Sequence, residues 1–209
     1  DGEKRYEPAN AADVEACAEC SRRLQTEVAA GHVSLPDAEL AHGYNTKQAI
    51  NYNYRCWRDF FNDRQLLALG WLQHAIADWP TIATRDALLT LFSGVLEFNN
   101  LFASYKGEGT GAVRHMFANH VLKPERLPIE ANVWGTLKSS GSFAGMFKTR
   151  LLRALDYRAA PIEVALEGTA KPPRARALVG RVEPNWPTNE PPRRGAVYLS
   201  CGSSDATGL

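Results

Sequence analysis

The chain has 209 residues, of which 44% are hydrophobic, and its 24 Lys and Arg against 23 Asp and Glu give a formal net charge of +1. This length and hydrophobic content can bury one good core, or one core with a small appendage. The balanced charge excludes the basic shell of a non-specific DNA coat, so any affinity for nucleic acid must be local.

The termini and the hydropathy pattern point to an excised piece of a cytoplasmic protein. No run of about 18 apolar residues is present, so we expect no membrane partner. The N-terminus, Asp1-Gly2-Glu3-Lys4-Arg5, has neither Met nor the hydrophobic region of a signal peptide.

A first helix is predicted from about Ala12 to Ala30. Cys17 and Cys20 lie in it at a spacing that places both on one face, whereas Cys56 and Cys201 stand alone. Zinc sites built from such motifs need a second pair, so we expect no metal site. The absence of paired cysteine spacing suits a reducing compartment.

The segment 43–58 is crowded with aromatic and basic side chains: Tyr44, Lys47, Tyr52, Tyr54, Arg55, Trp57 and Arg58. Rings that stack on bases and arginines that neutralise phosphate are typical of nucleic-acid contact. The same rings can instead anchor a loop onto the core. The sequence favours neither interpretation.

Two more helices are predicted before the middle of the chain. Asn62 and Gln65 have the spacing of a capping box, and the apolar positions that follow continue to about residue 79. Thr84 is predicted to cap the next helix, which is apolar nearly all round, as at the centre of a bundle. It ends at Asn99-Asn100, a pair that either satisfies the carbonyls of the helix end or faces a ligand, and we favour the structural role.

The stretch from Ser104 to His115 has the composition of a site. Three alternating glycines stand among charged residues: Lys106, Gly107, Glu108, Gly109, Gly111, Arg114 and His115. Glycines permit positive φ and let backbone N–H groups approach a flat or anionic ligand.

Three interpretations of this loop compete. It can be a flexible connection between helices. It can be a dinucleotide or S-adenosylmethionine loop, which needs a strand before the glycines and a helix after them. The helix after them fits, because residues 111–121 can restart one. The strand before them does not, because residues 85–102 are predicted as helix. We prefer a polar surface loop that contacts nucleic acid or an adjoining catalytic domain.

The fold class expected is a mainly α-helical region followed by a small α/β part. Residues 123–145 are expected to be largely irregular, followed by an amphipathic helix from about Ala144 to Tyr157. Composition changes near Pro161, so we divide the chain into 1–160 and 161–209. The second region is predicted to hold short strands at 162–166, 177–182 and 197–199.

Several motifs that follow one another in a fixed order resemble one family. They are Phe61-Asn-Asp-Arg-Gln-Leu-Leu-Ala-Leu69, Asn99-Asn100, the stretch 104–115, Leu122-Lys-Pro-Glu-Arg126 and Asn132-Val-Trp-Gly135. From about Asn45 to Leu209 the chain resembles the adenine-specific DNA methylases of the DUF1156 type. The resemblance implies a fragment of a Rossmann-like, S-adenosylmethionine-dependent methyltransferase with a helical insert, and leaves its biological setting, for example restriction-modification, open.

The chain departs from that family in its catalytic motifs. It has neither the glycine-rich cofactor motif after a strand nor the D-P-P-Y/F tetrapeptide, of which Glu183-Pro-Asn-Trp186 is only a superficial echo. Methylation of the adenine amino group needs that tetrapeptide, so the fragment alone is expected to be inactive and to hold no cofactor. What remains resembles the segment between the two motifs, where some DNA amino-methyltransferases carry their target-recognition region.

The resemblance therefore implies DNA and the remaining catalytic part of the polypeptide as partners. The expected nucleic-acid contacts are Tyr105, Lys106, Gly107, Gly109, Gly111, Arg114, His115, Lys123, Asn132 and Trp134. Ser204 and Asp205, in a turn after the strand at 197–199, are candidate contacts of S-adenosylmethionine, or else form an Asx-type turn.

The rival hypothesis is a structural module that docks the catalytic half without touching DNA. It predicts internal ion pairs among Lys106, Glu108 and Arg114. DNA binding predicts instead that basic side chains converge on one exposed face.

Overall fold

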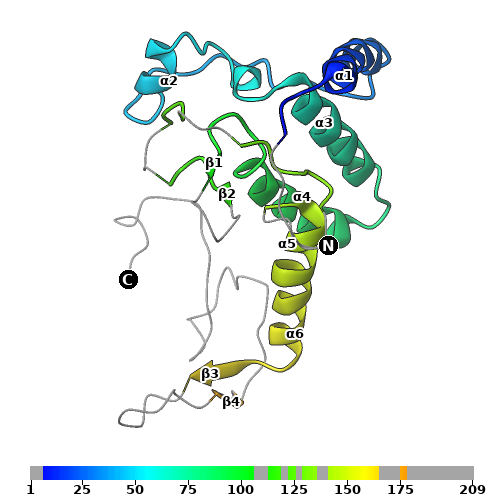
Figure 1. Cartoon of the computed structure of the whole chain (residues 1–209). Helices are drawn as coiled ribbons and strands as arrows, with labels where there is room; N and C mark the ends of the chain where they lie inside the picture. The colour runs from blue at the N-terminus through cyan, green and yellow to red at the C-terminus, as the bar shows by residue number, and fades with distance from the viewer. Residues whose placement is uncertain are drawn as a thin grey trace. The chain divides into compact units, whose positions relative to one another are not determined.

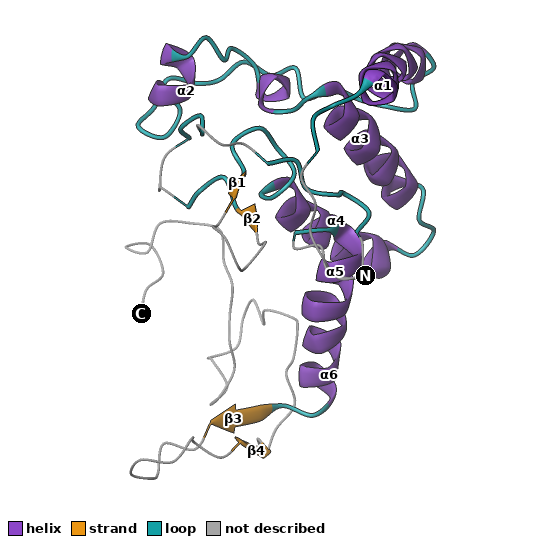
Figure 2. Cartoon of the chain, viewed as in Figure 1, coloured by secondary structure: helices purple, strands orange, loops and turns teal. Residues whose placement is uncertain are grey.

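The computed structural model of the chain describes residues 7–105, 113–118, 122–125, 129–135, 141–164 and 175–177. These residues are mainly helical, as the sequence predicts (Figures 1 and 2). Close contacts divide the chain into two compact units, Asp1–Leu151 and Leu152–Leu209. The change of composition near Pro161 falls inside the second unit, and a domain division there stays a prediction.

The first unit holds most of the helices. In chain order its elements are α1 (Ala11–Ala29), α2 (Lys47–Asn51), the 3-10 helix η1 (Trp57–Phe60), α3 (Asp63–Ala77), α4 (Ile82–Leu96), β1 (Ser104–Tyr105), β2 (Val113–Arg114), α5 (Phe143–Met146) and the π-helical segment η2 (Phe147–Leu152), whose last residue belongs to the second unit.

Capping residues fix where the long helices begin. The Asn62 side chain accepts from Gln65 N at 2.9 Å, and the Gln65 side chain accepts from Asn62 N at 3.0 Å, which confirms the predicted capping box of α3. The predicted cap at Thr84 is wrong. Helix α4 begins earlier, at Ile82, and its N-cap Thr81 makes no side-chain hydrogen bond, so its start depends on packing instead.

The main core lies between α3 and α4. Its buried side chains come from both helices, from the loop before α5 and from α5 itself: Leu69, Leu72, Ile76, Leu88, Leu91, Val95, Val133 and Met146. Burial of apolar surface contributes about 25 cal/mol per Å², so this cluster is the chief stabilising element of the unit.

A second cluster attaches α2 and η1 to the chain that follows α4. Its buried members are Leu40, Ala49, Phe60, Phe102 and Leu122. The Tyr54 ring lies 4.9 Å from Phe102, and the Trp57 ring lies 5.4 Å from Phe60, centroid to centroid. These two rings of segment 43–58 anchor the loop, whereas Tyr44 and Tyr52 are 85% and 63% exposed. The loop-anchoring interpretation is therefore confirmed for Tyr54 and Trp57, and nucleic-acid contact by the two exposed rings stays a prediction.

Helix α1 packs on α3 beside a buried carboxylate. Glu27 accepts from Arg23 Nε at 2.7 Å, and its other oxygen lies 2.9 Å from His32 Nδ1. The hydrogen bond with His32, helped by Trp71 and Arg23, lowers the pKa of Glu27 below its ordinary value although burial opposes this.

The second unit contains α6 (Arg153–Ala159) and the antiparallel pair β3 (Ile162–Val164) and β4 (Ala175–Ala177). The predicted helix Ala144–Tyr157 is confirmed within the helical residues 143–159. Strands β3 and β4 overlap the first residues of the strands predicted at 162–166 and 177–182. The later residues of these two predicted strands, and the predicted strand at 197–199, lie outside the described residues. None of the described helices is long and apolar enough to cross a membrane.

Gly70 makes a close approach between α3 and Val33. A β-carbon at Gly70 would lie 2.5 Å from Val33 Cγ1, whereas one at Gly94 in α4 would lie 3.3 Å from the flexible end of Arg150. Alanine gains roughly 1 kcal/mol over glycine within a helix, and overpacking costs about 1–3 kcal/mol. We expect Gly70→Ala to lower the free energy of unfolding by about 1–2 kcal/mol in urea titrations, and the matched Gly94→Ala to leave it unchanged or raise it. Equal effects would contradict the packing described.

The Glu27 cluster predicts a pH dependence of stability. Because the folded-state pKa of Glu27 lies below its ordinary value of 4.5, the carboxylate stabilises the fold above that value, and this contribution is lost as the pH falls through the folded-state pKa. Glu27→Gln should therefore lower the urea midpoint at neutral pH, and the difference from wild type should shrink as the pH falls below 4.5. A difference independent of pH would mean that the charge of Glu27 contributes nothing.

Candidate nucleic-acid interface

The two ends of the glycine loop meet in a short antiparallel hairpin. Ser104 lies opposite Arg114, and Tyr105 lies opposite Val113. Lys106, Gly107, Gly109 and Gly111 lie outside the described residues, so their roles stay predictions.

This hairpin corrects the prediction that a helix restarts at 111–121. Val113–Arg114 is a strand because it pairs with β1, and residues 116–118 form a turn. A dinucleotide or S-adenosylmethionine loop needs a strand before the glycines and a helix directly after them. Here a short strand precedes them and another strand follows, so the geometry lacks the helix that would hold a cofactor phosphate or carboxylate.

Two fully buried amides complete the end of α4. Asn99 Nδ2 donates to Val95 O at 2.8 Å and to Gly141 O at 2.9 Å. Asn100 Nδ2 donates to Leu96 O at 2.7 Å, and its Oδ1 accepts from Phe102 N at 2.9 Å. The structural role predicted for this pair is confirmed for both Nδ2 groups, which satisfy carbonyls of the helix end. The buried Asn99 Oδ1 has no hydrogen-bond partner among the described residues.

The same helix end positions Phe98. Gly141 has φ of +75°, and a β-carbon there would lie 2.3 Å from Phe98 Cβ, so only glycine fits this approach. The centroid of the His115 ring lies 5.8 Å from that of the Phe98 ring, in an edge-on arrangement. The Arg150 guanidinium carbon lies 6.0 Å from the Phe98 ring centroid. We call Phe98, His115 and Arg150, together with Arg114, which precedes His115 in the chain, the Phe98 cluster.

The basic members of this cluster are exposed and come from separate segments. Arg114 and His115 follow the glycine loop, and their segment is tied to α4 by Met116 N, which donates to Glu97 O at 2.9 Å. Arg150 comes from η2. Within the described ranges, neither arginine takes part in an ion pair. Both arginines are exposed, so anionic groups in the solvent can reach them.

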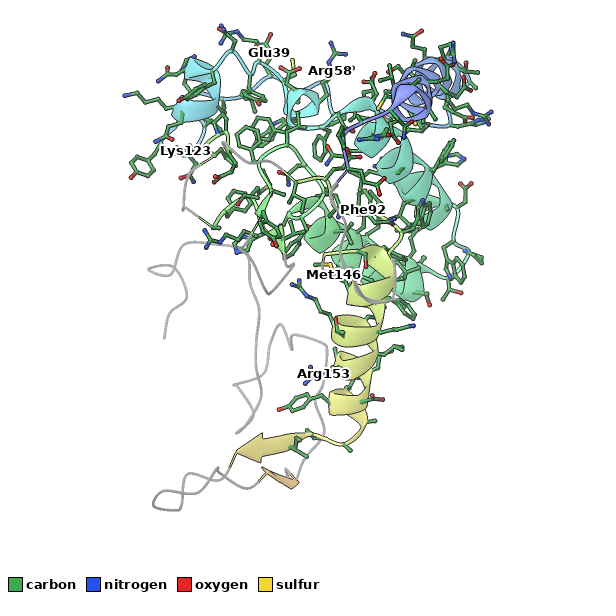
Figure 3. The ribbon with its side chains drawn as sticks, viewed as in Figure 1. Glu39, Arg58, Phe92, Lys123, Met146 and Arg153 are labelled. Atoms are coloured by element: carbon green, nitrogen blue, oxygen red, sulfur yellow. The ribbon has the colours of Figure 1, made fainter. Side chains whose placement is uncertain are left out.

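The other predicted contacts have different surroundings. Tyr105 is partly buried in the hairpin, and Trp134 is 49% exposed. Asn132 Oδ1 accepts from Gly135 N at 2.8 Å, so its carbonyl supports the loop rather than a base. Lys123 lies in the segment beside α2, where Leu122 N donates to Asn45 O at 3.2 Å (Figure 3).

Sequence reasoning missed Phe98 and Arg150 as members of the site. Phe98 lies at the end of a helix predicted to be apolar nearly all round, and Arg150 lies in the predicted amphipathic helix Ala144–Tyr157. They meet only through folding, so no local pattern marks the pair. Ser204 and Asp205, the predicted cofactor contacts, lie outside the described residues. Within the part of the chain that the structure describes, no three His, Cys, Asp or Glu side chains group as metal ligands.

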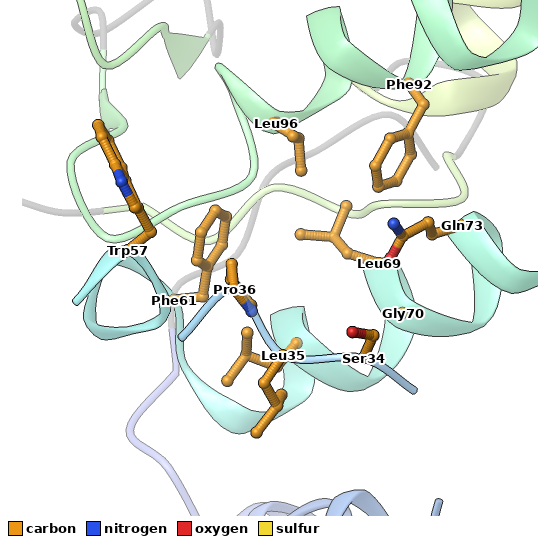
Figure 4. Close-up of a pocket in the computed structure, with 11 residues that line it drawn as sticks. Ser34, Leu35, Pro36, Trp57, Phe61, Leu69, Gly70, Gln73, Phe92 and Leu96 are labelled. Carbon is orange, nitrogen blue, oxygen red and sulfur yellow. The ribbon is translucent and has the colours of Figure 1, made fainter. Parts of the chain in front are cut away.

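A separate apolar groove of about 360 Å³ lies between α3, α4 and the segment 34–36 (Figure 4). Its walls are largely apolar, with Leu35, Pro36, Trp57, Phe61, Leu69 and Phe92 among them. Trp57 and Phe61 line the groove together with Pro36, and polar atoms come from Ser34 and Gln73. Its chemistry suits an apolar side chain better than a phosphate.

Comparison of the chain with known protein families, with curated proteins and with solved structures gives no match.

The Asn100 amide carries a testable share of stability. Its replacement by Ala leaves the buried Phe102 N–H without its acceptor, and an unsatisfied buried group costs about 1–3 kcal/mol. We expect Asn100→Ala to lower the free energy of unfolding by that amount in urea titrations, whereas Asn51→Ala, at an exposed position of α2, should change it by less than about 0.5 kcal/mol. An effect of Asn100→Ala as small as that of Asn51→Ala would contradict the role assigned to the amide.

Proposed function

We propose that the chain is part of an S-adenosylmethionine-dependent DNA adenine-N6 methyltransferase of the DUF1156 type, and that it contributes DNA recognition rather than chemistry. One observation carries the proposal: Arg150 and His115, from separate segments, both lie against the Phe98 ring, Arg114 precedes His115 in the chain, and neither exposed arginine has an ion pair among the described residues. Convergence of basic side chains is what DNA contact requires. The motif resemblance supplies the class of enzyme.

The chemistry of the Phe98 cluster suits the DNA backbone. Guanidinium groups hold phosphates through two parallel hydrogen bonds, and contacts of this kind position a protein on a duplex without reading its sequence. The net charge of +1 confines such binding to a local surface. Lys106 and the three glycines would extend this surface, and Tyr105 and Trp134 would contact bases.

The remaining catalytic part of the polypeptide would supply the Rossmann-like sheet, the cofactor and the D-P-P-Y/F motif. In this proposal the present chain has no activity alone and acts in the cytoplasm on DNA. Ser204 and Asp205 would approach S-adenosylmethionine only once that part is joined.

A docking module that never touches DNA is the second candidate. The apolar groove of about 360 Å³ favours it, because an open apolar groove next to the core suits side chains of another domain. In this alternative the groove would hold part of the catalytic half.

The salt dependence of DNA binding tests the proposal. We would measure binding of a fluorescein-labelled duplex by anisotropy across a salt series, for wild type and for Arg114→Ala/Arg150→Ala. Each lost phosphate contact reduces the slope of log K against log salt by about 0.9, so the double variant should have a slope shallower by roughly 2.

The control is Arg22→Ala, which removes one positive charge, half as many as the double variant, from an arginine paired with Glu15 and Glu19 on α1. It should leave the slope unchanged. If Arg22→Ala reduced the slope of log K against log salt as much as Arg114→Ala/Arg150→Ala does, a localised interface would be rejected. Absence of duplex binding at low salt by the folded chain would instead favour the docking module.

A further inference from the structure

A second hollow lies beside α2, in the same unit as the Phe98 cluster but formed by different residues. Its volume is about 490 Å³, and we call it the α2 hollow (His42, Gly43, Tyr44, Lys47, Ile50 and Asn51). Small-molecule sites commonly have volumes of about 300–1,000 Å³. The lining combines the rings of Tyr44 and His42 with one lysine and the Asn51 amide, and a planar base that carries a phosphate can use each of these groups.

Tyr44 is the most informative residue of the hollow. Of the aromatic side chains in segment 43–58, Tyr54 and Trp57 pack against the core, whereas Tyr44 is 85% exposed. The fold therefore gains little packing from its ring. An exposed ring on the rim of a hollow is the usual platform on which unpaired bases stack.

Lysines from two parts of the chain lie near the hollow: Lys47 in its lining and Lys123 in the segment bonded to Asn45. Lys47 begins α2 and lines the hollow. Lys123 follows Leu122, whose N–H donates to the carbonyl of Asn45, next to Tyr44. Both lysines are exposed, and no ion pair of either is found among the described residues. Two ammonium groups beside a ring provide charge for the phosphate of a stacked nucleotide.

The backbone that holds these side chains is fixed. The Thr46 hydroxyl donates to Ala41 O, and Ala49 is fully buried against the second cluster. Beyond α2, the Arg55 guanidinium donates to Ile50 O and to Asn53 Oδ1, each at 3.1 Å, and Asn53 has φ of +70°. A platform held in this way loses little conformational freedom when it binds a ligand.

We propose that the α2 hollow binds an unpaired nucleotide, with Tyr44 stacked on the base and Lys47 and Lys123 directed to its phosphate. A base within a duplex does not expose its face to such a ring, so the ligand is a nucleotide outside the double helix. The source is either a single DNA strand or a free nucleoside monophosphate, because both present the same ring and phosphate.

Anisotropy of a short labelled single DNA strand tests this proposal on the full chain. Loss of one base–aromatic stack should weaken binding about tenfold or more, so we expect this loss for Tyr44→Ala and retention of affinity for Tyr44→Trp. The matched control is Tyr52→Ala, which removes an exposed tyrosine that does not line the hollow. Lys47→Ala should reduce the salt slope by about 0.7.

Titration of adenosine monophosphate, followed by calorimetry, distinguishes the two sources. Binding of the strand alone, dependent on Tyr44, identifies the polymer as the ligand; binding of the mononucleotide, also dependent on Tyr44, identifies the free nucleotide as a ligand of the same site. Equal effects of Tyr44→Ala and Tyr52→Ala, or binding of neither ligand by the folded wild type, overturn the proposal.

These outcomes are independent of the Phe98 cluster. A strand affinity that depends on Tyr44, together with a duplex slope unaffected by Arg114→Ala/Arg150→Ala, would uphold the α2 hollow and reject the proposed duplex interface.

Discussion

The buried amides of Asn99 and Asn100 are the constraint on which the candidate interface depends. They satisfy carbonyls at the end of α4. Through Phe102 N they also bind the segment that leads to β1, and through Gly141 O the segment that precedes α5. A buried amide holds its partners in a fixed geometry because any unmade hydrogen bond there costs free energy. The end of α4 is thus a fixed junction for β1, for the approach to α5 and for Phe98.

The Phe98 cluster follows from this junction. Gly141 packs directly on Phe98, and α5 is anchored by Met146 in the main core, so η2 presents Arg150 at the same ring. On the other side, Met116 N bonds to Glu97 O and brings His115 to Phe98. Hydrogen bonds and packing from the core therefore fix the two backbone segments that carry the exposed arginines.

Features set by neighbouring residues could be predicted from the sequence, and features set by long-range contacts could not. The capping box at Asn62 and the role of Asn99-Asn100 are local, so their residue types were sufficient. The sequence after the glycine loop is compatible with a helix as well as with a strand. The strand forms because Val113 pairs with Tyr105, and that pairing depends on the register between two strands. The meeting of Arg150 with Phe98 likewise has no local signature. Segment 43–58 was ambiguous because its rings divide between core and solvent.

Hydrogen exchange of the full chain, with and without saturating duplex DNA, tests the central claim most directly. Amides covered by a ligand exchange more slowly. The account predicts that DNA slows exchange in residues 113–118 and 147–152, which carry the basic members of the Phe98 cluster, and leaves α1 unchanged. Slower exchange at the apolar groove or α1, with no change in those two segments, would contradict it.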